Sequence, residues 1–84
     1  MSYAYLDEYK ILHVVDSEDQ AKQYASGKTV ETDISHGEGF PEVNGQHVIV
    51  YTDKGEYKIG GSMYPISQLE KISPQIAELV NKLK

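Results

Sequence analysis

The residues best suited to chemistry in this chain are its three histidines, because it contains no cysteine. Without cysteine there is no thiol nucleophile and no thiolate metal ligand, so a metal site would need imidazoles and carboxylates. His36, Glu38 and His47 are the residues we assign to such a site. No HxxxH or HExxH motif joins them, and chance explains three histidines in a chain of this length. No cofactor is therefore predicted, and the metal site stays an alternative hypothesis.

Catalysis without a metal finds little support in the sequence. There is no GxSxG elbow, and the carboxylates fall mostly in turns, in first turns of helices and at alternating strand positions. The loop Gly37–Phe40 has glycines but precedes an edge strand rather than a helix, which argues against a phosphate cradle. His13 lies in an apolar run and is interpreted as a packed residue. We therefore assign no catalytic residue and favour a function other than enzymatic activity.

The charge of the chain limits its partners. The formal net charge is −5, and all eight basic residues are lysines. Arginine is the residue best suited to bidentate contacts with phosphate and guanine, so its absence argues against direct binding of nucleic acid. Lysine without arginine, beside many isoleucines and tyrosines, suggests a bacterial or phage origin. The N-terminus does not resemble a secretory signal, and no segment approaches a membrane span, so we expect a cytoplasmic protein without a membrane partner.

Turn chemistry predicts a three-stranded meander in the middle of the chain. Asn44-Gly45 suits a two-residue type I′ hairpin turn, and Asp53–Gly55 suits a three-residue loop closed by a left-handed glycine. Between them, residues 46–52 carry apolar side chains on both faces. That pattern is typical of a central strand, so we expect the rest of the chain to pack around it.

The flanking segments predict two helices and two further strands. Ser17 and Gln20 match a capping box, which predicts a helix over about 17–26 with Gly27 in the left-handed position after it. Ala21, Tyr24 and Ala25 are expected on its inner face. Ser73-Pro74 predicts the start of a C-terminal helix over about 74–83 with one apolar stripe. Strands are predicted at 9–15 and 29–35, and residues 1–8 are interpreted as a frayed or extended arm.

The fold class that follows is α+β, in one small domain covering 1–84. The expected order is β-α-β-β-β-β-α, with a mixed or antiparallel sheet of four to five strands. The sequence leaves open whether the first two strands pair in parallel. Few helical residues are available to cover the sheet, so one face should stay half open, and a homodimer would close it.

The leading functional hypothesis is a small protein–protein interaction or regulatory module. It rests on the short length, the acidic charge and the tyrosines, which favour interfaces because they offer large area and a polar tip. The opposing interpretation is that these tyrosines fill a small core without tryptophan. The predicted partner-binding residues are Phe40, Tyr51, Tyr57 and Tyr64.

Two other hypotheses belong to different classes. One is an enzyme subunit that depends on a metal or small ligand held by His36, Glu38 and His47. The other is an acidic inhibitor that mimics nucleic acid and occupies a basic site on its target. The mimic requires carboxylates on one face, for instance Glu31, Asp33, Glu38 and Glu42.

Overall fold

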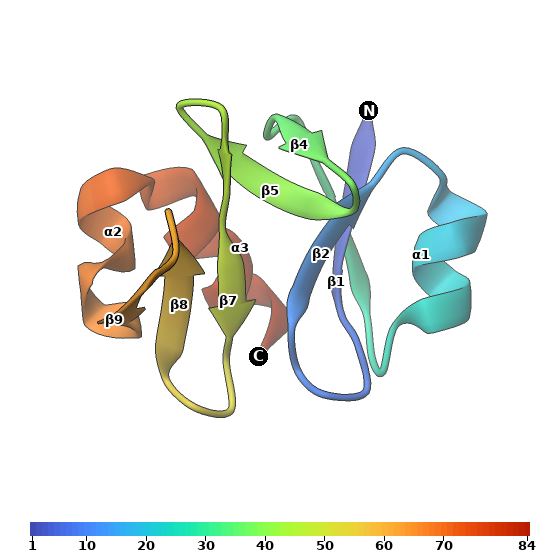
Figure 1. Cartoon of the computed structure of the whole chain (residues 1–84). Coiled ribbons are helices and arrows are strands. Elements are labelled where there is room, and N and C mark those ends of the chain that lie inside the picture. The colour runs from blue at the N-terminus through green and yellow to red at the C-terminus, as the bar shows by residue number, and fades with distance from the viewer.

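A computed structural model describes all residues from Met1 to Lys84 as a small α+β fold. Nine short strands form three separate antiparallel sheets, each of three strands, and three helices pack around them (Figure 1). The helices are α1 (Glu18–Tyr24), α2 (Leu69–Ile72) and α3 (Pro74–Leu83), with a 3-10 turn, η1 (Ile66–Gln68), before α2. The strands are β1 (Ser2–Leu6), β2 (Leu12–Val15), β3 (Thr29–Thr32), β4 (His36–Gly37), β5 (Phe40–Val43), β6 (Gln46–His47), β7 (Ile49–Tyr51), β8 (Glu56–Ile59) and β9 (Ser62–Pro65).

The N-terminal segment is the centre of the first sheet, whose order is β2-β1-β3. Strand β1 pairs antiparallel with both neighbours, so β2 and β3 run parallel to each other without pairing. The helix α1 joins these two outer strands. The predicted strand order therefore differs from the structure, because residues 1–8 contain a paired strand rather than a frayed arm. Its alternation explains the difference: Ala4 is fully buried on one face and Tyr5 is buried on the other.

The central meander is present but divided. Asn44, Gly45 and Gly55 all have positive φ, which confirms both predicted turns. The single strand predicted over 46–52 is wrong, because β6 pairs with β5 whereas β7 pairs with β8. Val48 lies between them, is fully buried, and donates its backbone N–H to the Pro41 carbonyl at 2.8 Å. The chain changes sheets at this residue, as strands do at the corners of packed sheets.

Two further hairpins account for the extra strands. Glu38-Gly39 joins β4 to β5, and Gly60-Gly61 joins β8 to β9. All four residues have positive φ, the conformation that a type I′ turn needs at both central positions. Both pairs form tight chain reversals, and the added strands raise the total above the four to five strands that the sequence predicts.

The predicted N-cap of α1 is present, but the helix ends earlier than the sequence predicts. Ser17 Oγ accepts the Gln20 backbone N–H at 3.1 Å, as the capping box requires. The helix α1 nevertheless stops at Tyr24, and Gly27 does not adopt a left-handed conformation. The Ser26 backbone N–H and hydroxyl both donate to the Leu6 carbonyl, at 2.8 and 3.1 Å. These bonds draw the chain onto the end of β1 before another helical turn can form.

The C-terminal helix α3 has the predicted bounds, and the Ser73 hydroxyl caps it by accepting the Ile76 N–H at 3.2 Å. No helix of the structure is both long enough and apolar enough to cross a bilayer.

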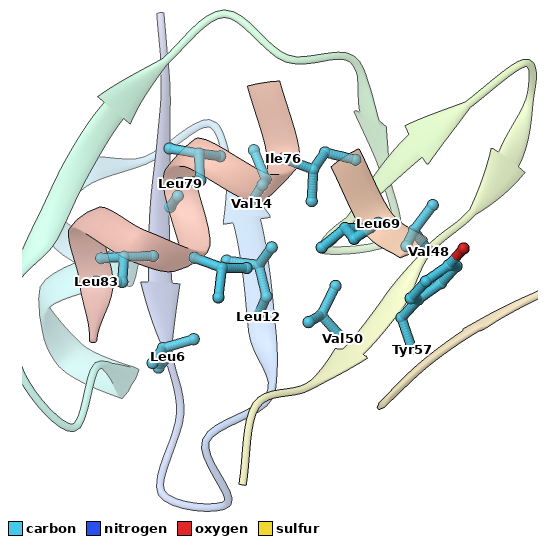
Figure 2. Packing of buried hydrophobic residues seen from close by; sticks show 12 residues of the cluster. Leu6, Leu12, Val14, Val48, Val50, Tyr57, Leu69, Ile76, Leu79 and Leu83 are labelled. Carbon is cyan, nitrogen blue, oxygen red and sulfur yellow. The ribbon is translucent and has the colours of Figure 1, made fainter. Parts of the chain in front are cut away.

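The first sheet separates two apolar clusters of unequal size. On one face, β1 and β2 pack against α3, α2 and the β7–β8 hairpin (Figure 2). On the other face, Tyr5 and Val15 pack against Ala21 of α1. Tyr24, expected on the inner face of this helix, is instead exposed. The larger cluster consists of Ala4, Leu6, Leu12, Val14, Val48, Val50, Tyr57, Leu69, Ile76, Leu79, Val80 and Leu83.

Candidate functional site

The turn between β1 and β2 is organised by the carboxylate of Asp7. Its Oδ1 accepts the backbone N–H of Tyr9 at 2.8 Å and that of Ile11 at 3.0 Å. The Asp7 carbonyl accepts the Lys10 N–H at 2.9 Å, and Lys10 adopts a left-handed φ of 63°. The Lys10 ammonium in turn donates to Ser26 Oγ at 3.2 Å, just beyond α1. These bonds fix the turn against the chain that follows the helix.

The same carboxylate holds the imidazole of His13. Asp7 Oδ2 lies 2.7 Å from His13 Nε2. The imidazole lies between two aromatic rings, with centroid distances of 5.0 Å to Tyr5 and 5.1 Å to Phe40. Burial raises the pKa of Asp7, but hydrogen bonds from the Ile11 amide, from His13 and from the Tyr9 amide lower it, and the net pKa lies below its usual value. Asp7 is therefore anionic at neutral pH.

A cavity of about 500 Å³ lies between this turn and the C-terminal end of α1. Tyr9 and Tyr24, whose side chains are 71% and 55% exposed, line it from opposite elements. The buried part of its lining includes Tyr5, whose pKa is raised by burial and by the nearby Asp7 and Tyr24. The full lining is Tyr5, Asp7, Glu8, Tyr9, His13, Gln23, Tyr24, Ala25 and Ser26.

Chemically, this arrangement favours binding over bond-making. The Asp7–His13 pair resembles the base and orienting carboxylate of a triad, but the hydrogen bonds of His13 include none with a hydroxyl. The two oxygens of Asp7 instead hold the turn amides and the imidazole of His13. What the cavity offers is aromatic surface, carboxylate charge and a rigid frame.

Of the predicted partner-binding residues, Tyr57 and Tyr64 contact each other, whereas Phe40 and Tyr51 have other neighbours. Tyr57 is 2% exposed and belongs to the main core, with its ring stacked on Tyr64 at 5.5 Å. Tyr64 itself is 37% exposed on β9. Phe40 is half-buried between His13 and His47, and the half-buried Tyr51 has the Lys54 ammonium 5.4 Å from its ring centroid. Of the four, Tyr64 presents the most open surface.

The predicted metal ligands are not gathered into one set, because the two histidines pair with different carboxylates. His36 Nε2 lies 2.9 Å from Asp16 Oδ1, and His47 Nε2 lies 3.5 Å from Glu42 Oε2. Glu38 lies in the β4–β5 turn, where it lines a cavity with His36. No group of three or more histidine and carboxylate side chains is arranged to hold a metal ion.

The acidic residues named for a nucleic-acid mimic divide between cavities. Glu31 and Asp33 line one, Asp33 and Glu42 line another, and Glu38 lines the separate cavity beside His36. Glu42 is also the partner of His47.

Tyr9 and Tyr24 were missed by sequence reasoning. Tyr9 was assigned to the first strand, although Asp7-Glu8-Tyr9-Lys10 contains a turn-forming aspartate that points to a reversal. Tyr24 was assigned to the inner face of its helix because of its spacing from Ala21. No local signal indicates that the helix ends there, because the hydrogen bonds that follow its end join Ser26 to the Leu6 carbonyl of β1.

No protein-family model matches the chain, and neither curated proteins nor solved structures give a match. The function must therefore be inferred from the geometry and chemistry of the chain itself.

Proposed function

We propose that this protein acts by binding another protein, and that the contact surface is the cavity between the β1–β2 turn and α1. The observation that carries the proposal is the placement of its two most exposed aromatic side chains. Tyr9 and Tyr24 come from different elements and line the same cavity. Tyrosine is enriched at protein interfaces because a large apolar ring is combined with a polar tip.

The frame of the cavity supports this role. Tyr9 sits in a turn held by the Asp7 carboxylate, and Tyr24 is the last residue of α1, whose next residues are tied to β1 through Ser26. A surface fixed before binding loses less conformational freedom when a partner docks. Buried Tyr5 lines the same cavity. A partly buried centre with exposed aromatic residues around it is typical of the energetic centres of interfaces.

A second surface, around β9, is the alternative contact. All four residues of β9 are exposed, and Met63 and Tyr64 present apolar surface there. The strand is short, however, and Pro65 lacks a backbone N–H for an added strand. Tyr64 also stacks on the buried Tyr57, so packing of the hairpin is enough to explain its position. The cavity is therefore the preferred site.

The test compares two double variants in affinity capture from a lysate of the source cells. Tyr9→Ala/Tyr24→Ala removes the exposed rings of the cavity, and Met63→Ala/Tyr64→Ala removes those of β9. Circular dichroism melts check that both variants fold. We expect the parent chain and the β9 variant to retain one stoichiometric partner, and the cavity variant to lose it.

The captured partner is then purified and titrated against all three chains by calorimetry. We expect a loss of at least tenfold in affinity for the cavity variant, because interface tyrosines are among the residues that dominate binding. Unchanged affinity in the cavity variant, or loss confined to the β9 variant, contradicts the proposal.

A further inference from the structure

We infer that the cavity receives a cationic side chain, lysine or arginine, from the partner protein. This inference rests on the proposed function and specifies the chemistry of the partner at that site. Three features of the cavity carry it: the sign of its charge, the identity of its rings and its size.

The charged groups of the cavity are predominantly acidic. Asp7 and Glu8 line it, and the depressed pKa of Asp7 keeps that carboxylate ionised at neutral pH. The imidazole of His13 is directed through Nε2 at Asp7. The Lys10 ammonium donates to Ser26, a lining residue, at 3.2 Å, so one ammonium stands beside two carboxylates. Anionic ligands are therefore disfavoured, and a cation is attracted.

The rings of the cavity favour the same ligand. Tyr5, Tyr9 and Tyr24 all line the cavity, and the rings of Tyr9 and Tyr24 are the exposed ones that a ligand can reach. The faces of aromatic rings carry negative potential, and they attract ammonium and guanidinium groups within about 6 Å of the centroid. The raised pKa of Tyr5 has burial as its main cause, and its remaining causes, Asp7 and Tyr24, show that these groups lie close enough to interact electrically. The tyrosine rings and the Asp7 carboxylate would therefore attract a cation into the same cavity.

The cavity is large enough to admit one long side chain. Its volume is about 500 Å³, within the range of about 300–1,000 Å³ that accommodates small ligands. Lysine and arginine combine an apolar stem, which packs on tyrosine rings, with a charged end that reaches a carboxylate. An uncharged apolar side chain would fill the same space but would not offset the negative charge that Asp7 and Glu8 place in the lining.

The test uses single-residue probes and amide chemical shifts of the isotopically labelled chain. The probes are N-acetyl-arginine methylamide and its uncharged analogue N-acetyl-citrulline methylamide, with the lysine and norleucine pair in parallel. We expect the cations to shift the amides of Tyr5, Tyr9 and Tyr24 with dissociation constants on the order of millimolar, as suits one side chain. The uncharged probes should bind at least about fivefold more weakly.

Variants separate ring contact from charge. Tyr24→Leu should weaken binding of the arginine probe about two- to fivefold, the range of an exposed cation–π contact. Glu8→Gln should weaken it about twofold at low ionic strength, with the difference lost in high salt. Glu70→Gln, an exposed acid on α2, is the matched control and should leave binding unchanged.

Equal binding of the arginine and citrulline probes overturns the inference. So do shifts spread over all acidic surfaces, and equal effects of Glu8→Gln and Glu70→Gln. If these outcomes occur while the cavity variant still loses its protein partner, the proposed function stands and only the cationic ligand is rejected. If the probes bind as expected but no partner depends on the cavity, the proposed function is rejected instead.

Discussion

Replacing Asp7 gives the most informative test of how the cavity is built. The carboxylate accepts two backbone amides, from Tyr9 and Ile11, and its other oxygen meets His13 at 2.7 Å. Each hydrogen bond to a charged group contributes about 1.5–3 kcal/mol, and the exposed Tyr9 amide should fall at or below the lower end. Because neighbouring bonds are not additive, we expect Asp7→Ala to lower the free energy of unfolding by about 2–4 kcal/mol.

Urea denaturation followed by circular dichroism measures this effect. For a domain of this size the slope is about 1–2 kcal/mol per molar urea, so the midpoint should fall by about 1–4 M. Asp7→Asn keeps an oxygen for the two amides and loses the charge, so it should cost about 1–2 kcal/mol. Glu8→Gln, in the same turn, is the control and should change stability by less than about 0.5 kcal/mol.

The pH dependence of the stability difference between the parent and Asp7→Asn tests whether the charge of Asp7 stabilises the fold. The pKa of Asp7 is lower in the folded chain than in the unfolded one, so its contribution is present above the unfolded pKa of about 4. The contribution is lost as the pH falls through that value toward the folded pKa. We therefore expect the difference in stability between the parent and the variant to be larger at pH 7 than at pH 2. An equal difference at both pH values refutes the electrostatic role of Asp7.

Four further substitutions test the rest of the fold, each by the free energy of unfolding in urea. Leu12→Ala should cost about 2–5 kcal/mol, because Leu12 is fully buried in the main cluster; a cost under 1 kcal/mol contradicts that packing. Glu38→Asn should stabilise by about 0.5–1 kcal/mol and Asn44→Glu should do the reverse, because both residues have positive φ in two-residue turns; equal signs contradict the turn assignment. Ser73→Ala should cost about 1 kcal/mol through loss of its bond to the Ile76 amide, and an unchanged midpoint contradicts the cap.

Features set by neighbouring residues were predictable from the sequence. The Ser73 cap and the stripe that follows it predict α3 with its observed bounds, because both signals act within a few residues. Asn44-Gly45 and Gly55 predict their turns because the backbone conformation there suits so few residue types. The α+β class follows from the same local signals.

Features set by distant residues were not predictable in the same way. The division of the strand at Val48 depends on which sheet each half meets, and the early end of α1 depends on the Leu6 carbonyl. Both are tertiary effects without a local pattern. The cavity could not be predicted for the same reason. Tyr9 and Tyr24 come together only because β1 lies beside the chain that leaves α1.

The most direct test of the proposed function is site-specific photo-crosslinking. A benzophenone amino acid is placed at Tyr24 in one chain and at the exposed Gln75 of α3 in the control, and the source cells are irradiated. We expect the substitution at Tyr24 to yield one discrete adduct, identified by mass spectrometry, and the control to yield none. Adduct formation should fall when Tyr9→Ala is added. Absence of any adduct from Tyr24, or the same adducts from both positions, contradicts a binding surface at the cavity.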